Sequence, residues 1–493
     1  MKRREFCATG AAALTTLCLP YGRARAADAE VAAIGSDGRP TSLSRPDIDE
    51  LRGGLRGDLI LPGDGSYDAA RRLWNPAFDR KPALIVRCAG AADAVRAVSF
   101  AGAHKLLTAV HGGGHSLSGL SSCDGGIMID VSPMRAVEVD PLARQARVAA
   151  GALLGQLDRE AQAFGLATTA GTVADTGVAG LTLGGGVGRI GRRFGLTCDS
   201  LLSMEVVTAD GRWQRASATE NPDLFWALRG GGGNFGVVTE FVFQLHEVNP
   251  QMYGGEILFP LAGARQLLRH FADWLASAPD ELYVDVDLET NEKLGKTVGF
   301  DVCYSGPVAD AQRVLAPLRK LGKPLKDTLA PSTYLSLQGS SDTPGFSRFG
   351  TYVKGGLIYG LTPQLIDVVI GCAEESPSDL MAVWMQHQGG AISRVAPQDT
   401  AYFGRGASHN MGVAGAWKVP SADAERNIGY VRTAWGKIEP LTRGNYVNIA
   451  NSDDRDTRIH AAYGDNYARL ASVKKRYDPN NLFHLNANIK PAA

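Results

Sequence analysis

Three glycines between two histidines form the first stretch of the chain whose residue types could do chemistry. The stretch runs His111, Gly112, Gly113, Gly114, His115, and Ser116 follows it. Three consecutive glycines leave their backbone N–H groups unshielded, so a bulky anion such as a pyrophosphate can approach them closely. His115 adds a ring nitrogen that is nucleophilic near neutral pH. These residues alone are equally consistent with a glycine turn flanked by two incidental histidines.

Two later matches to the dinucleotide-binding pattern G-x-G-x-x-G raise the possibility of a Rossmann domain. They lie at residues 186–191 and 231–236, and Asp210 follows the first at about the distance of a ribose-binding acid. A Rossmann fingerprint follows a strand and opens a helix. Here the segment before Gly186 is short and broken by glycines, and Gly195 interrupts the helix that should follow. Both matches are therefore weak evidence for such a domain.

The glycine-rich stretches resemble the FAD domain of the berberine-bridge-enzyme-like flavoproteins, which belong to the vanillyl-alcohol-oxidase or PCMH-type superfamily. His111 to His115 resembles the family pattern R-x-G-G-H, with His111 in the place of the arginine, and residues 221–239 resemble the segment that ends the FAD domain. The resemblance implies a covalent bond from His115 to the 8α-methyl group of FAD. Many members add a second bond through a cysteine where this chain has Val173, so we expect one bond, through His115 alone.

The resemblance also implies which other residues contact FAD. They come from the two glycine-rich stretches, the strand that follows them and the end of the chain: His111, Gly112, Gly113, Gly114, Ser116, Gly171, Thr172, Gly177, Gly180, Leu181, Gly184, Gly185, Gly188, Val238, Asn448 and Asn488. No metal site is expected, because no cysteine pair has C-x-x-C spacing.

Tyr446 stands where family oxidases place a tyrosine that deprotonates the substrate. Because a free tyrosine has a pKa of about 10, this role requires a lowered pKa; a buried core tyrosine is the alternative. Residues 384–390 resemble the family strand that faces the flavin. On a strand Gln386 and Gln388 share one face and His387 takes the other, so either the two glutamines, as predicted catalytic residues, or the histidine can face the pocket.

Length and pattern predict an α+β protein of about two domains. The chain has 493 residues, 44% of them hydrophobic, and equal numbers of basic and acidic residues. Strands and helices alternate in the first half, and helices alternate with strands again after residue 248. We predict a PCMH-type FAD-binding domain of two subdomains and a substrate domain with an antiparallel sheet backed by helices. The predicted segments are an N-terminal arm (27–79) that is irregular up to about residue 59, the FAD domain (80–248), the substrate domain (249–440) and a segment returning to the FAD domain (441–493).

The amino terminus resembles a bacterial twin-arginine export signal. Arg3 and Arg4 precede an apolar stretch that is too short to span a bilayer, and residues 24–26 read A-x-A before Ala27. We expect residues 1–26 to be removed after the twin-arginine machinery exports the folded protein, which would then be periplasmic or secreted. Five cysteines remain, an odd number, so at least one thiol is free or pairs between molecules. The zero net charge gives no indication of nucleic acid or an anionic membrane as a partner.

Together these expectations describe an FAD-dependent oxidase. A hydride would pass from a carbon bearing a hydroxyl or amine to the flavin, and O2 would take the electrons to give H2O2, so the partners are a small-molecule substrate and O2. Two alternatives remain open: a dehydrogenase of the same fold with another electron acceptor, and a flavin-binding protein without catalysis.

Overall fold

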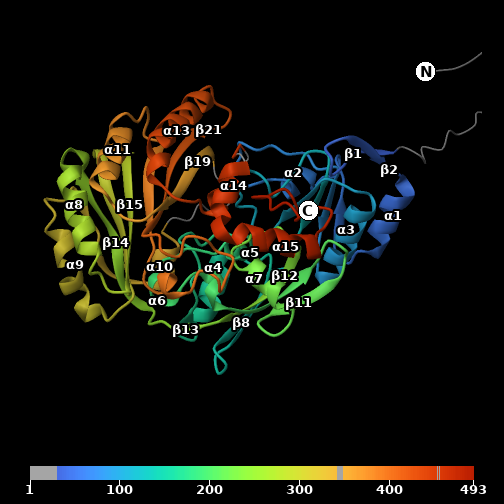
Figure 1. The fold of residues 1–493 in the computed structure, drawn as a ribbon, viewed down its shortest axis with the longest axis horizontal. Coiled ribbons are helices and arrows are strands. Elements are labelled where there is room, and N and C mark those ends of the chain that lie inside the picture. The colour runs from blue at the N-terminus through green and yellow to red at the C-terminus, as the bar shows by residue number, and fades with distance from the viewer. Residues whose placement is uncertain (1–29, 341–347, 452, 455) are drawn as a thin grey trace, which may run out of the picture.

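The computed structural model describes residues 30–340, 348–451, 453–454 and 456–493, which form two adjoining domains (Figure 1). The predicted export signal lies outside the described residues. Among the described helices, none combines the length and the apolar character needed to cross a bilayer.

The N-terminal segment is ordered, which corrects the prediction of an irregular arm. Strands β1 (Val31–Ile34) and β2 (Pro40–Leu43) pair, α1 (Arg45–Gly54) follows, and β3 (Asp58–Ile60) joins the first sheet beside β4. The hydroxyl of Ser44 accepts a hydrogen bond from the first turn of α1, and Ile48 and Leu51 are buried beneath it. Strands of three or four residues are too short to show a clear alternation in sequence, which explains the error.

The first domain contains two sheets. One is mixed, in the order β3, β4 (Leu84–Arg87), β6 (Ile127–Asp130), β5 (Thr108–His111). The other is antiparallel, in the order β11 (Trp213–Ser217), β10 (Leu201–Val207), β12 (Val237–Gln244), β8 (Gln145–Ala149), β7 (Val137–Asp140), and β9 (Leu166–Ala167) pairs separately with β13 (His246–Glu247). Besides α1, the helices of the first domain are α2 (Tyr67–Ala70), α3 (Ala91–Ala103), α4 (Leu154–Gln162), α5 (Val178–Leu183), α6 (Gly191–Phe194) and α7 (Pro222–Leu228).

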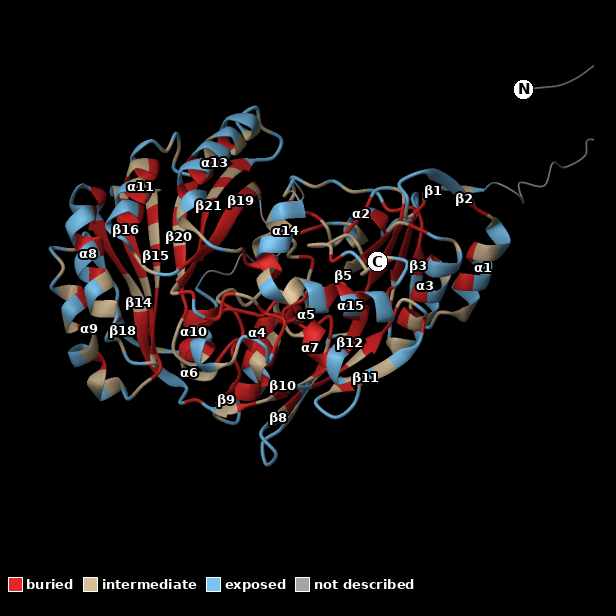
Figure 2. Cartoon of the chain, viewed as in Figure 1, coloured by how far each residue is buried: buried red, intermediate tan, exposed pale blue. Residues whose placement is uncertain are grey.

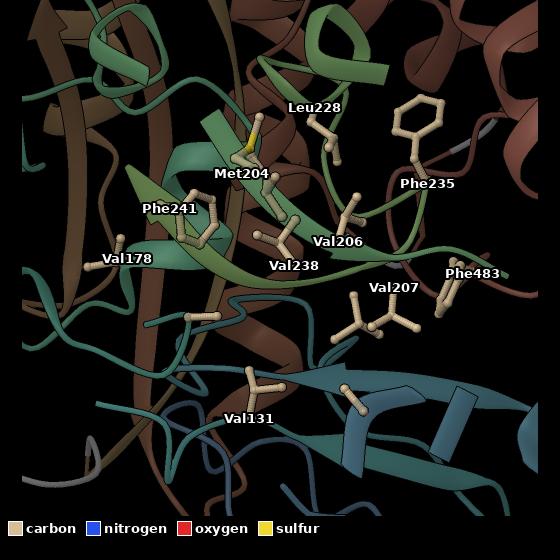
Figure 3. Close-up of a cluster of buried hydrophobic side chains, with 14 of the residues drawn as sticks. Val131, Val178, Met204, Val206, Val207, Leu228, Phe235, Val238, Phe241 and Phe483 are labelled. Atoms are coloured by element: carbon tan, nitrogen blue, oxygen red, sulfur yellow. The ribbon is translucent and has the colours of Figure 1, made fainter. Parts of the chain in front are cut away.

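One continuous apolar core joins these two sheets. Figure 3 shows Val206 and Val238 of the antiparallel sheet above Val131, which directly follows β6. Phe483, from the last part of the chain, lies beside Val207 in the same cluster. The core of the first domain is therefore incomplete without the C-terminal segment.

The second domain is built on an antiparallel sheet. Within the described residues its path is β17 (Lys326–Asp327), β14 (Gln251–Pro260), β16 (Gly295–Tyr304), β15 (Leu282–Asn291), β20 (Met381–His387), β21 (His409–Lys418), β19 (Phe349–Ile358), and β18 (Ala330–Thr333) pairs with β14. Its helices are α8 (Ala264–Leu275), α9 (Ala311–Arg319), α10 (Tyr334–Gln338), α11 (Pro363–Glu374), α12 (Ala391–Arg394) and α13 (Ala424–Ile438).

Four of these helices cover one face of the sheet, as the sequence predicts. Helices α8, α9, α11 and α13 lie on the outer side, with exposed outer surfaces and buried strands beneath them (Figure 2). In α8, Leu267, Leu268 and Phe271 are buried, a spacing of one and three residues that makes one apolar stripe. The opposite face of the sheet is left to meet the first domain.

The C-terminal segment returns to the first domain. Helices α14 (Asp456–Tyr463) and α15 (Tyr467–Tyr477) lie against it, with α15 beside α7 (Figure 1). The fully buried ammonium of Lys474 donates to the Asp478 carboxylate at 2.5 Å and to the carbonyl oxygens of Asn234 and Phe483. Burial lowers the pKa of Lys474, while Asp478 opposes that shift. This ion pair fastens the end of the chain to the glycine-rich loop before β12.

Replacing Lys474 with methionine tests this attachment. Loss of the ammonium leaves the Asp478 carboxylate buried without its cation, so we expect Lys474→Met to lower the free energy of unfolding by about 3–5 kcal/mol. Denaturant unfolding followed by fluorescence measures the change. Lys475→Met, one residue along on the exposed face, is the matched control and should change it by less than about 0.5 kcal/mol. Equal stabilities of the two variants would contradict the assignment.

Candidate functional site

A cavity of about 420 Å³ lies where loops of the first domain meet β20 and the C-terminal segment. Its walls come from the loop after β5, the loop between β9 and α5, helix α5, the loop before β12, and residues 446–451. Most of the residues predicted to contact FAD or substrate line it: Gly112, Gly113, Gly114, His115, Ser116, Thr172, Gly177, Gly180, Leu181, Val238, Gln386, Tyr446 and Asn448. Most of the residues predicted from the sequence therefore lie around one cavity, although the role of each residue stays a prediction.

Seven predicted residues do not line this cavity: His111, Gly171, Gly184, Gly185, Gly188, Gln388 and Asn488. His111 lies beneath the glycine loop, because a Cβ on Gly114 would come within 2.8 Å of its ring. Burial lowers the pKa of His111, although Asp130 on the neighbouring strand opposes this. The histidine is thus placed to support the loop from below.

The glycines around the cavity permit close contacts between backbones. A Cβ on Gly113 would lie 2.4 Å from the Cα of Gly177, so the two glycine-rich loops touch where neither has a side chain. A Cβ on Gly184 would lie 2.0 Å from Oδ1 of Asn448, and one on Gly185 would meet the ring of Tyr402. Part of the glycine richness is therefore explained by packing between chain segments.

His115 lies on the cavity wall between an aromatic ring and a carboxylate. Its imidazole stacks on Trp74 with ring centroids 4.5 Å apart, and its Nε2 lies 3.6 Å from a carboxylate oxygen of Asp175. Nε2 is buried and makes no hydrogen bond within the described part of the chain. The imidazole is therefore held in place with one nitrogen facing Asp175.

The phenol oxygen of Tyr446 accepts three hydrogen bonds. The backbone N–H groups of Gly186 and Val187 donate to it at 3.1 and 3.3 Å, and the side-chain amide of Asn448 donates at 2.8 Å. All three donors stabilise the phenolate, yet burial outweighs them and raises the pKa of Tyr446 to about 12. The lowered pKa that the base role was expected to require is therefore not found in the protein alone.

Strand β20 separates Gln386 from His387. Its side chains alternate, with Met381, Val383, Met385 and His387 buried and Ala382, Trp384 and Gln386 half-buried. Gln386 lines the cavity and accepts a hydrogen bond from Asn410, while His387 faces away. The strand ends at His387, so the alternation does not extend to Gln388, whose side-chain amide bonds the hydroxyl of Tyr402 instead.

None of the cysteines that the structure describes lines the cavity. Val173, at the position where many family members have a cysteine, lines the cavity, whereas Cys198 is buried elsewhere. Cys198 and the other four described cysteines are buried free thiols: Cys88, Cys123, Cys303 and Cys372. Burial raises the pKa of Cys123 to about 12, which keeps that thiol protonated. No group of three or more potential metal ligands occurs among the residues described.

The structure adds residues that sequence reasoning did not single out. Asp175 was overlooked, although a lone carboxylate inside a glycine-rich loop is a signal that could have found it. The cavity is also lined by Gly232, Gly233 and Asn234. These three residues belong to the segment 221–239, which resembles the end of the family's FAD domain. Asn234 donates to the hydroxyl of Tyr463 and so links this loop to α14.

Both G-x-G-x-x-G matches are incompatible with a Rossmann fingerprint. The first follows helix α5 and leads into α6, a helix of only four residues, and the second follows α7 and leads into strand β12. Asp210 lies in the turn of the β10–β11 hairpin and pairs with Arg212. Neither match has a strand before it and a full helix after it, so neither indicates a Rossmann domain.

Two family profiles match the chain. One, described as an FAD binding domain, matches residues 82–217, and the other, described as berberine and berberine like, matches residues 445–490. They cover the two parts of the chain that meet at the cavity.

Known proteins are similar over nearly the whole chain. (R)-6-hydroxynicotine oxidase of Paenarthrobacter nicotinovorans is 31% identical over 89% of this chain and 97% of its own length. An uncharacterised FAD-linked oxidoreductase of Bacillus subtilis is also 31% identical, over 89% of this chain and 97% of its own length. The crystal structure of 6-hydroxy-D-nicotine oxidase from Arthrobacter nicotinovorans has a TM-score of 0.82 at 29% identity and covers 89% of this chain and 98% of its own. A chitooligosaccharide oxidase structure has a TM-score of 0.83 at 25% identity, over 91% and 100%.

Substituting alanine at two neighbouring glycines tests the contact between the loops. In Gly113→Ala the new methyl group would collide with the backbone of Gly177, so we expect the affinity for FAD before attachment, and with it the flavin incorporated, to fall by at least about tenfold, equivalent to ~1.4 kcal/mol. Flavin absorbance per mole of desalted protein measures retention. Gly112→Ala is the control, because its methyl group would lie at ordinary contact distances from Ala150 and Ala179. Full retention in Gly113→Ala would show that the loops can separate without harming the site.

Proposed function

The chain belongs to the berberine-bridge-enzyme-like family of PCMH-type FAD-linked oxidoreductases, and on this premise we propose that it is an oxidase of small alcohols or amines. The observation that carries the proposal is the placing of Tyr446 and Gln386 on the same cavity as His115. A proton acceptor, a hydrogen-bonding group and a nucleophilic imidazole thereby share one space.

The cavity suits FAD on structural grounds. The contact between Gly113 and Gly177 leaves a wall of bare backbone, and Nε2 of His115 is a buried polar atom without a hydrogen bond. When bound, FAD supplies the acceptor for a hydride from the carbon next to the hydroxyl or amine, and in our proposal O2 then takes the electrons and gives H2O2. The glycine-rich loops would hold the cofactor through their N–H groups.

His115 is the proposed single attachment point. For an imidazole to form a bond through one nitrogen, that nitrogen must keep its lone pair and the proton must reside on the other. The Asp175 carboxylate, 3.6 Å from Nε2, favours a proton on Nε2 and so leaves the lone pair on Nδ1. Trp74 restricts rotation of the ring by stacking on it. Val173 offers no thiol for a second bond.

Tyr446 is the proposed base. It would take the proton from the substrate hydroxyl or amine as the hydride leaves the neighbouring carbon. The N–H groups of Gly186 and Val187 and the amide of Asn448 would stabilise the charge that develops on the phenol oxygen. Gln386, which lies on β20 and is fixed by its hydrogen bond from Asn410, would orient the substrate.

The substrate class follows in part from the relatives. One similar protein is named for a hydroxynicotine and another for chitooligosaccharides. With one attachment rather than two, we favour a small or medium substrate over a long oligosaccharide. A screen of alcohols, sugars and amines for anaerobic bleaching of the flavin, followed by admission of air and a peroxide assay, tests both the substrate class and the acceptor.

Acid precipitation tests the attachment. Wild-type protein should give a yellow pellet after washing, because a covalent flavin stays with the chain, while His115→Ala should give a colourless pellet and a yellow supernatant. Asp175→Asn should slow attachment and Asp175→Glu should largely restore it, since only the latter keeps a carboxylate near Nε2. Mass spectrometry of a flavin peptide containing His115 identifies the site. A yellow pellet from His115→Ala would refute the proposed bond.

Tyr446→Phe tests the base. Removing the hydroxyl should slow anaerobic flavin reduction by about 10²–10⁴-fold while the flavin spectrum stays unchanged. In the wild type the reduction rate should rise with pH, by about tenfold per unit, because the phenolate fraction grows towards a pKa of about 12. Asn448→Ala removes one donor to the phenolate and should move the profile to higher pH. Stopped-flow reduction across pH measures all three, and an unchanged rate in Tyr446→Phe would remove this residue from catalysis.

A further inference from the structure

The outer edge of β19 lies against the first domain. Within the described residues β19 is the last strand along its sheet and pairs with β21 on one side only, so the backbone groups on its other side have no strand partner. At Thr351 both of these groups, the N–H and the carbonyl oxygen, bond the side-chain amide of Asn75 instead. Asn75 therefore links the second domain to a segment that precedes the glycine-rich loops.

The amide of Asn75 is buried and uses all of its hydrogen-bonding positions. Its Nδ2 donates to the carbonyl oxygens of Leu117 and Thr351, both at 2.8 Å. Its Oδ1 accepts from the N–H groups of Thr351 at 3.1 Å and Ala77 at 3.2 Å. Because an amide offers two donors and two acceptor positions, this one is saturated and fixed in orientation. Leu117 comes two residues after His115, so one side chain joins the His115 loop to β19.

Trp74, the residue before Asn75, holds the same loop. Its backbone N–H donates to the carbonyl oxygen of Gly114 at 3.0 Å, and its ring stacks on the imidazole of His115. The bond from Asn75 to Leu117 holds the loop on the other side of the histidine. Trp74 and Asn75 thus form a clamp that fixes the backbone on both sides of His115 and the ring itself.

Flavin attachment requires the imidazole to meet the 8α-methyl group of FAD in one orientation. The new N–C bond replaces a C–H bond of that methyl group and the N–H bond of the imidazole. The two hydrogens leave as two protons and two electrons, which pass to the flavin ring and then to O2, the acceptor in our proposed function, giving H2O2. A displacement of about 1 Å between reacting groups can slow such a step by about 10²-fold. The clamp therefore bears directly on the rate of attachment.

We propose that Asn75 is a positioning residue for flavin attachment and makes the bond at His115 depend on docking of β19 against the first domain. This inference rests on the proposed bond between His115 and FAD. With β19 docked, the backbone of Thr351 holds the Asn75 amide, which in turn holds the carbonyl oxygen of Leu117. With β19 undocked, the amide loses two of its four bonds and the loop is no longer fixed. FAD then binds reversibly to the glycine-rich loops, and the covalent bond forms only in the docked molecule.

The rate of attachment in the full-length apoprotein tests the proposal. Protein from riboflavin-limited cells is mixed with excess FAD, and acid-precipitated flavin is followed with time, while quenching of flavin fluorescence measures reversible binding. In Asn75→Ala we expect attachment at saturating FAD to be about 10–100-fold slower than in the wild type, with reversible binding retained. An attachment rate equal to that of the wild type would overturn the proposal.

Asn427→Ala separates positioning from a loss of stability. Asn427 is similarly buried, and its amide donates at 2.7 Å to the carbonyl oxygen of Ala416, the β21 residue that pairs with Thr351. Both variants should lower Tm, because each removes a buried amide from a strand, but only Asn75→Ala should slow attachment. Equal slowing in the two variants would show that stability alone is responsible and would refute the positioning role.

Thr351→Pro tests the docking from the other domain and remains informative if Asn75→Ala does not fold. It removes the N–H that β19 donates to Asn75 and leaves the contacts of the clamp with the loop in place. Proline is tolerated on an edge strand where the N–H faces outwards. We expect slower attachment than in Asn427→Ala, and the wild-type rate in Thr351→Pro would overturn the dependence on docking.

Hydrogen exchange gives a readout that does not involve the flavin bond. In the apoprotein, exchange of a peptide containing residues 112–120 should rise in Asn75→Ala and stay unchanged in Asn427→Ala, and unchanged exchange in both would refute the clamp. A wild-type chain without covalent flavin would refute the proposed bond at His115 and with it the positioning role. Normal attachment in both the wild type and Asn75→Ala would refute the positioning role alone.

Discussion

The hydrogen bonds from Gly186 and Val187 to the phenol oxygen of Tyr446 join residues about 260 positions apart. For this contact to form, the C-terminal segment must approach the glycine-rich loop more closely than any side chain would allow. A Cβ on Gly184 would overlap the amide of Asn448, two residues beyond Tyr446. The same loop that provides bare backbone for a cofactor thus also provides space for the segment that completes the cavity.

Parts of both domains could be predicted because their signals are local. In α3 of the first domain the buried residues Ala94, Ala97, Val98 and Ala101 recur at intervals of three and four, as in a helix. In β20 of the second domain the alternation separates Gln386 from His387, as a strand requires. The resemblance to known flavoproteins identified the loops that meet at the cavity, because a loop contacting one cofactor keeps a recognisable residue pattern.

The errors arose where tertiary contacts override local pattern. The N-terminal strands are too short to show a period. Strands β19 and β21 contain glycines that weaken the sequence signal of a strand, and they form because they pair with each other and with β20. Gln388 was placed by extending a strand past its end. The pKa of Tyr446 depends on burial by segments far away in sequence, and the position of Asp175 beside His115 depends on the contact between two loops.

Strand β20 divides the molecule into two chemical environments. Gln386 faces the cavity of the proposed oxidase, and the next residue, His387, lines a second cavity of about 540 Å³ together with Arg192 and Gln388. The hydrogen bond from Gln388 to Tyr402, whose ring lies edge-on to that of Tyr446 at 6.1 Å, connects the two sides. Gln388, Tyr402 and Tyr446 therefore form a short chain of contacts from one cavity to the other.

The burial of Lys474 and Phe483 in the first domain has a consequence for biosynthesis. A ribosome that has made the first 440 residues has produced both glycine-rich loops but neither Tyr446 nor the ion pair that fastens α15 to them. The pocket can close only after residues 446–483 have been synthesised and have left the exit tunnel. A complete pocket therefore exists only once this tail has folded back, and a chain that terminates before it would be left with an open, uncovered core.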